Sequence, residues 1–125
     1  MRFIHDGDGS DFKQAGPAGS TQIEDVFFRF FEENSLPAET TPFVGGSEYE
    51  PFLRAGIPVG GLFSGDVKNK TTAQVQAYGG AAGKDLDSCY HRACDTISNT
   101  NADLLKEMSA ALAYATATFA LAPRD

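Results

Sequence analysis

The chain has 125 residues, a net charge of −7 at neutral pH and 42% hydrophobic residues, so residues 1–125 form one domain or part of one. The acidic balance argues against binding to nucleic acid and to anionic membrane surfaces. No apolar run approaches the ~20 residues needed to cross a bilayer, and no signal peptide is visible after Met1.

The first third of the chain predicts a strand and then a helix. Residues 2–5 are a short apolar run, which is typical of a strand. Thr21 and Glu24 are spaced as a capping box, which predicts the start of a helix. The apolar residues of this helix fall on one face, namely Ile23, Val26, Phe27, Phe30 and Phe31. Phe28 lies off that face and needs separate cover.

An acidic, glycine-rich segment at residues 6–11 separates these two elements. It resembles the start of a calcium loop, but the sixth and twelfth positions of an EF-hand require Gly and Glu, where this chain has Asp11 and Pro17. A turn built by Asx side chains therefore fits better than a cation site. For His5, which precedes the segment, a structural or exposed role fits better than a role as a ligand.

The middle of the chain predicts two further strands around a short helix. Residues 40–44 form the first strand, and a turn at Gly45–Gly46 follows it. Ser47 is placed to cap a helix over residues 48–55. Residues 57–63 are apolar and predict a buried strand, whose two glycines indicate close backbone approach or a bulge.

The last third begins with a long polar loop at residues 67–83, with a helical turn at Thr72 to Ala77. A helix starts near Thr100 or Asn101 and ends before Pro123. Its predicted packing stripe is Leu104, Met108, Ala111, Leu112, Ala115 and Phe119. Strands alternate with helices along the whole chain, which predicts an α/β fold with about three strands.

The sequence Cys89-Tyr90-His91-Arg92-Ala93-Cys94 holds both cysteines and one of the two histidines. The cysteines are too far apart for a Cys-x-x-Cys metal or redox site. A disulfide between them would close a small loop around His91 and contribute on the order of 2 kcal/mol. Spacing alone leaves two interpretations open: a surface disulfide beside an incidental histidine, or a loop that aims an imidazole for metal or proton chemistry.

Several short motifs occur in one order along the chain, at residues 45–52, 56–65, 70–71, 74, 79–80 and 89–95. Together they resemble the secreted bacterial leucyl aminopeptidase family of di-zinc metallopeptidases. The resemblance runs from Phe3 to Leu121 and covers the C-terminal part of such an enzyme. It implies a partial three-layer α/β/α sandwich with a small mixed sheet, a peptide substrate and an extracellular location.

The resemblance also implies the chemistry. In that family two zinc ions share a carboxylate and a water, whose pKa the metal lowers toward ~7. A nearby Glu accepts the proton when the water attacks the peptide carbonyl, and one N-terminal residue is removed.

Individual roles follow from the matched positions. His91 matches the position of the family's last zinc ligand. Tyr90 matches the position of a tyrosine that, in some members, contacts the tetrahedral intermediate. Cys89 and Cys94 stand where those members have a disulfide. Phe63 falls at a wall of the pocket for an apolar first side chain.

Gly45 and Gly46 fall at the substrate-facing turn. The family often has Gly-Arg-Ser-Asp there, whereas this chain has Gly45-Gly46-Ser47-Glu48. Gly46 can replace an Arg that acts through its carbonyl, but substrate binding is weakened if the Arg acts through its side chain.

The remaining zinc ligands and the proton-accepting Glu would lie upstream of this chain. Since each zinc needs about four ligands, His91 cannot hold two zinc ions, so we expect weak or no zinc binding and no activity from the chain alone. Two hypotheses remain. The chain is the C-terminal part of a zinc aminopeptidase, or it is a non-catalytic module that keeps the scaffold and binds a partner or self-associates through an exposed sheet edge.

Overall fold

The computed structural model describes residues 1–122 and contains a small mixed sheet. The strand order is β2-β1-β3, with β1 (Phe3–His5) in the centre. β2 (Glu39–Thr41) is parallel to β1, and β3 (Leu62–Phe63) is antiparallel to it. The predicted mixed α/β fold is therefore confirmed.

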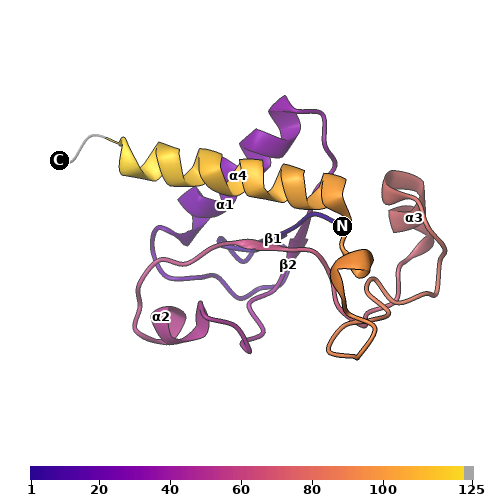
Figure 1. Ribbon diagram of the computed structural model, residues 1–125. Helices are drawn as coiled ribbons and strands as arrows, with labels where there is room; N and C mark the ends of the chain where they lie inside the picture. Colours follow the sequence, from indigo (N-terminus) through magenta and orange to yellow (C-terminus); the bar gives the residue numbers. More distant parts are fainter. Residues whose placement is uncertain (123–125) are drawn as a thin grey trace.

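Helices surround this sheet, as Figure 1 shows. They are α1 (Ser20–Glu33), α2 (Glu50–Arg54), α3 (Thr72–Tyr78), the 3₁₀ helix η1 (Ile97–Asn99) and α4 (Ala102–Ala120). In that view α1 and α4 lie above the sheet, α2 lies below it, and α3 stands to one side. Within residues 1–122, no helix is both long enough and apolar enough to cross a membrane.

The hydrophobic core lies between the sheet, α1 and α4. Its buried members are Ile4, Val26, Phe27, Phe31, Ala111 and Ala115. The predicted packing face of α1 is confirmed. The separate cover expected for Phe28 was a wrong prediction, because Phe28 packs partly buried against the same core. The α4 stripe was wrong at two positions, because Leu112 and Phe119 are 56% and 45% exposed. α4 is buried through its small residues Ala111 and Ala115, which turns these two side chains outward.

The capping box at Thr21 and Glu24 was a wrong prediction. α1 begins at Ser20, and the N-cap residue Gly19 makes no side-chain cap. The buried Glu24 carboxylate instead accepts the amide hydrogens of Gly7 and Asp8. Its partner is thus the loop before the helix, which a local sequence pattern does not reveal.

The strands are shorter than predicted, since the central strand β1 is only three residues long. Of residues 57–63, only Leu62 and Phe63 form β3, and the Gly61 carbonyl adds one bond to β1 by accepting the His5 amide hydrogen at 3.1 Å. The close backbone approach is confirmed at Gly60, where an added Cβ would lie 2.3 Å from Cγ2 of Ile23. α2 begins at Glu50 without the predicted cap from Ser47.

Two helix starts carry side-chain caps. Thr71 and Gln74 form a capping box at α3, and the Asn101 side chain accepts the amide hydrogen of Leu104 at α4. The predicted start of α4 near Asn101 is confirmed, whereas Pro123 lies outside the described residues.

Candidate functional site

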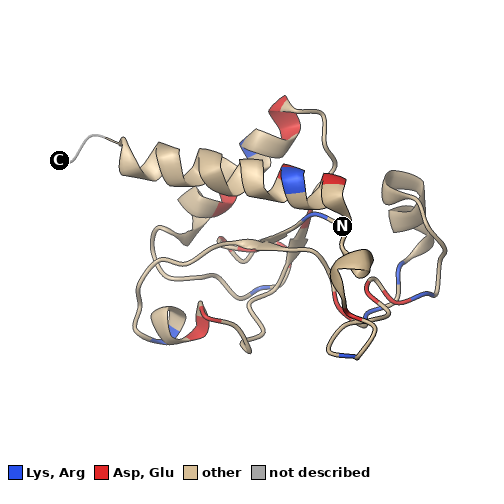
Figure 2. Cartoon of the chain, viewed as in Figure 1, with Lys and Arg blue, Asp and Glu red and all other residues tan. Residues whose placement is uncertain are grey.

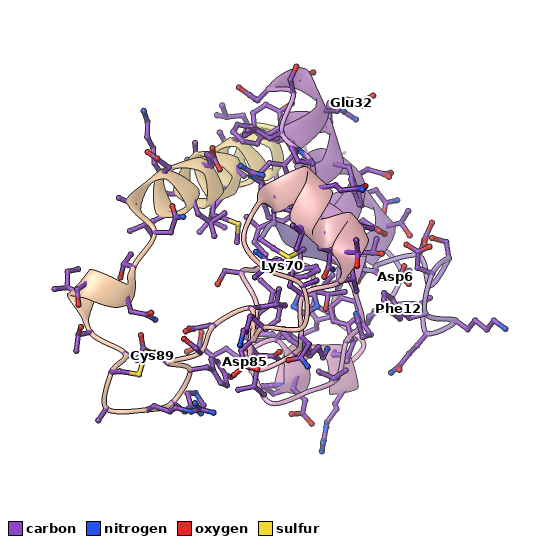
Figure 3. All side chains as sticks on the ribbon, turned by 90° about the vertical axis from the view of Figure 1, so that its right-hand side faces the viewer. Asp6, Phe12, Glu32, Lys70, Asp85 and Cys89 are labelled. Atoms are coloured by element: carbon purple, nitrogen blue, oxygen red, sulfur yellow. A yellow bond between two sulfur atoms is a disulfide. The ribbon has the colours of Figure 1, made fainter. Side chains whose placement is uncertain are left out.

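A short backbone ladder carries the cystine loop away from the sheet. After β3 ends, residues 66–70 bond to residues 84–87, with the Leu86 amide donating to Lys68 O and the Asp87 amide to Asp66 O, each at 2.9 Å. Figure 3 shows the result, in which the loop labelled at Cys89 projects beyond Asp85. The loop is thus anchored at its base and open to solvent at its tip.

Cys89 and Cys94 form a disulfide with their Cα atoms 5.3 Å apart, which confirms the pairing. Inside the ring, His91 adopts a left-handed backbone with φ of 55°. The His91 and Tyr90 rings stack with centroids 4.0 Å apart and an interplanar angle of 13°. Tyr90 is half-buried and His91 is exposed, so the imidazole is presented outward on a closed loop.

Asn99 joins the two arms of this loop. Its side-chain amide donates to Asp87 Oδ1 at 3.0 Å and to Asp95 Oδ1 at 3.2 Å. Asp87 Oδ1 also accepts the amide hydrogen of Cys89 at 2.9 Å. The hydrogen bonds from Asn99 and Cys89 hold the pKa of the Asp87 carboxyl below its ordinary value. Sequence reasoning missed these residues, although Asp two positions before Cys89 is a local Asx signal.

A polar cavity of about 770 Å³ lies behind the loop, between its base, α3 and the start of α4. Asp87, Asp95 and Asn99 line it, but Tyr90 and His91 do not. On its far wall, the Tyr78 hydroxyl is buried, and burial raises the pKa of Tyr78 to about 12. The cavity is therefore lined by residues at the base of the loop that carries His91, and not by His91 itself.

The Gly45–Gly46 turn is held from α2. Both glycines have left-handed backbones, with φ of 79° and 76°. The Gly45 amide donates to Tyr49 Oη at 2.9 Å, and the Gly46 amide donates to Glu50 Oε2 at 3.0 Å. The hydrogen bond from the Gly46 amide is the largest cause that lowers the pKa of Glu50, and the hydrogen bond from the Arg54 guanidinium is the second. The turn is therefore preformed, and its two amides are already used.

Aromatic residues connect this turn to the sheet. The Tyr49 ring packs on His5 and on Phe43, at centroid distances of 4.8 and 5.2 Å. His5 also stacks on Phe43, and burial lowers the pKa of its imidazole. His5 is thus a packed, structural histidine, as predicted. Phe63 is half-buried in β3, with its ring 6.1 Å from that of Phe3.

A separate acidic cluster lies at the N-terminal side of α1. Ligand oxygens of Asp6, Asp8 and Glu24 lie within 4.8 Å of one another, as a metal site would require. These carboxylates already accept backbone hydrogens, from the amides of Gly7, Asp8, Gly9, Ser10, Asp11 and Phe12. The arrangement matches the predicted Asx-built turn, and the hydrogen bonds explain why the acidic groups converge.

The structure brings together Tyr90, His91 and the disulfide, and separately the glycine turn and α2. Across residues 1–122, no hydrogen bond or ring contact joins the cystine loop to Gly45–Gly46 or to Phe63. Among the described residues, His91 belongs to no group of three or more His, Cys, Asp or Glu side chains placed to hold a metal ion. These residues alone therefore do not fit a complete zinc site.

The sequence matches the profile of peptidase family M28 over residues 3–116. It is 44% identical over 117 residues to leucine aminopeptidase 2 of Trichophyton rubrum, and this match covers 94% of the chain and 24% of that protein. It is 45% identical over 122 residues to an aminopeptidase of Pseudomonas aeruginosa, covering 98% of the chain and 23% of that protein. The chain thus spans about a quarter of the length of the curated relatives it matches.

Proposed function

The chain belongs to peptidase family M28, and from this premise we propose that it is the C-terminal segment of a zinc-dependent aminopeptidase. The observation that carries the proposal is the match over nearly the whole chain to proteins named as aminopeptidases. The parent would remove an N-terminal, apolar residue from a peptide. The bound metal would supply an activated water for this hydrolysis.

We assign the roles in this chain to two separate parts of its surface. His91 would be one metal ligand, and the outward imidazole on a disulfide-closed loop supports that role. Tyr90, stacked on it, would contact the reacting carbonyl. Gly45 and Gly46 would face the substrate on a turn held by their amides, which donate to Tyr49 and Glu50, and by the Gly45 carbonyl, which accepts the Tyr49 hydroxyl at 3.3 Å. Phe63 would contact the first side chain.

The remaining metal ligands and the proton acceptor would come from outside these 125 residues. The isolated chain should therefore show no aminopeptidase activity and at most weak, substoichiometric zinc binding. The measurement is turnover of leucyl-p-nitroanilide by the pure chain. Activity that disappears with a chelator and with His91→Ala would overturn this assignment of the missing groups.

A chimera tests the parent function directly. The 122 residues of the Pseudomonas aeruginosa aminopeptidase that match this chain would be replaced by the corresponding residues of this chain. We expect a zinc-containing chimera that hydrolyses leucyl-p-nitroanilide and loses activity with His91→Ala. A folded chimera without activity, whose parent enzyme is active under the same conditions, would contradict the proposal.

The disulfide supports an extracellular location, because such bonds persist in oxidising compartments. The proposed secretion of the parent is tested by tracking the native protein between cells and medium. Recovery of the parent only from the reducing cytoplasm would contradict it.

The second candidate function is a non-catalytic module that binds a partner or self-associates. It is favoured by the open outer edges of β2 and β3, since the described sheet contains only three strands. Sedimentation of the pure chain over a concentration series tests it. Association supports this candidate for the isolated chain, and a monomer at every concentration argues against it.

A further inference from the structure

We propose that Asn99 is a positioning residue for the Tyr90–His91 pair. This inference rests on the proposed function, in which His91 and Tyr90 act on metal and substrate. In this proposal, a set of polar hydrogen bonds, here called the clamp, fixes the conformation of their loop together with the disulfide. The clamp consists of Asn99, Asp87 and Asp95.

The clamp closes a second ring outside the disulfide. The covalent ring joins positions 89 and 94, two residues after Asp87 and one residue before Asp95. The Asn99 side-chain nitrogen bonds to both of these carboxylates, at 3.0 and 3.2 Å. One primary amide thus ties the entry of the loop to its exit.

The entry arm is further fixed at the residue that starts the covalent ring. The same Asp87 oxygen that accepts from Asn99 accepts the Cys89 amide hydrogen at 2.9 Å. The clamp therefore reaches the backbone one residue before Tyr90. Without Asn99, the carboxylates of Asp87 and Asp95 would face each other with no shared donor, and their like charges would favour separation of the arms.

A disulfide alone does not set this conformation. Cystine fixes the distance between two Cα atoms, but it leaves the backbone inside the ring free to choose among several turns. His91 occupies a left-handed conformation that is costly for a residue with a Cβ and persists when its surroundings fix it. The hydrogen bonds at the base of the loop provide this restraint on both arms.

The Asn99 backbone is held independently, which makes its side chain a suitable anchor. Its amide donates to Thr96 O at 2.8 Å in η1, directly before α4. Ser98, its neighbour, bonds only to the Thr96 hydroxyl among the side-chain partners that the structure describes. Ser98→Ala is therefore a matched control that removes a hydrogen bond from the same turn without touching the clamp.

The test is NMR of the disulfide-bonded chain, because it contains only two histidines. Stacking on Tyr90 shifts the ring protons of His91, and Tyr90→Ala gives the reference shift of an unstacked imidazole. His5, which stacks on Phe43 inside the fold, reports whether the rest of the molecule is unchanged. We expect Asn99→Ala to move the His91 shifts most of the way to the unstacked reference, with His5 unaffected.

Asn99→Asp keeps the side-chain size but replaces the donor by a third carboxylate, so its effect should be at least as large. In the same variants, the equilibrium constant for forming the Cys89–Cys94 disulfide from its thiols should fall by about two- to tenfold. Ser98→Ala should leave both measurements at their wild-type values.

Unchanged His91 shifts in Asn99→Ala would overturn the proposal. A change in both histidines would also overturn it, because Asn99 would then support the whole fold and not the loop. Neither readout involves zinc or turnover, so this result is independent of the chimera experiment. If the chimera is inactive but Asn99→Ala displaces His91 in the isolated chain, the proposed function is refuted and the positioning role of Asn99 still holds.

Discussion

Glu24 shows how one buried side chain connects two parts of the fold. It is 6% exposed and lies on α1, but its carboxylate bonds to the amides of Gly7 and Asp8 in the preceding loop. The loop follows β1 directly, so this carboxylate fixes the path from the central strand to the helix. Burial, the largest cause, raises the pKa of Glu24 despite these hydrogen bonds.

The raised pKa determines the sign of a pH effect on stability. The folded chain binds the Glu24 proton more tightly than the unfolded chain, so the stability that depends on this proton is full below the ordinary glutamate pKa. It is lost as the pH rises through the raised pKa of the folded state. Glu24→Gln removes this loss and keeps an oxygen for the two amides. The difference in unfolding free energy, Glu24→Gln minus wild type, should therefore become more positive as the pH rises.

Urea unfolding at a series of pH values measures this difference. Glu24→Ala serves as the comparison, because it removes the acceptor and should cost about 1–3 kcal/mol. If the unfolding free energies of Glu24→Gln and the wild type change in parallel with pH, the Glu24 carboxyl has the same pKa in the folded and unfolded chain, which contradicts the prediction.

At the scale of elements, helices were predicted better from sequence than strands were. The packing face of α1 and the start of α4 follow from local apolar spacing and from the Asn101 cap, which are properties of neighbouring residues. The length of β3 depends on the three residues available in β1, a distant segment. The disulfide was predictable from a resemblance, but the Asn99 clamp was not, because its partners are set by the fold of the loop.

The segment that leads into β3 packs directly against α1. An added Cβ at Gly60 would lie 2.8 Å from Cβ and 2.3 Å from Cγ2 of Ile23, whereas at Gly61 the nearest atom would be 3.8 Å away, on His5. The branched carbon of Ile23 cannot move without shifting α1. Two adjacent glycines in the same segment thus have different roles.

Gly60→Ala should lower the free energy of unfolding by about 1–3 kcal/mol, because it overpacks the contact with α1. Gly61→Ala should be neutral or stabilising by up to about 1 kcal/mol, since it only restricts the unfolded chain. Thermal or urea unfolding of both variants measures the difference. Equal effects at the two positions would mean that the segment moves away from α1 at little cost.

At the scale of the whole molecule, the described surface combines dispersed charge with exposed apolar side chains. Figure 2 shows lysine and arginine at separate places along the chain, and acidic residues near helix ends and in the segment before the cystine loop. On a flank of α4, beside its buried face, Leu105, Leu112 and Phe119 are 57%, 56% and 45% exposed. They are seven residues apart and so share one stripe, which lies within about a quarter turn of Ala111 and Ala115. The stripe thus widens the apolar surface of α4 beyond the part that the fold buries.

This stripe and the sheet edges are two surfaces through which the isolated chain would self-associate. The edges are short, with three residues in β2 and two in β3, so each offers only a few backbone hydrogen bonds to a second chain, and the apolar stripe would add the buried area. We therefore expect Leu112→Asp, in the centre of the stripe, to shift the chain toward monomer by at least about tenfold in dissociation constant. Sedimentation over a concentration series measures this shift.

Val44→Asp provides the matched control, because Val44 is 75% exposed and lies between β2 and the glycine turn, away from α4. It introduces the same charge and should leave the dissociation constant unchanged. If both variants associate like the wild type, the strand edges carry the interaction. If both dissociate equally, added negative charge on a chain with a net charge of −7 is the cause, and the α4 stripe has no special role.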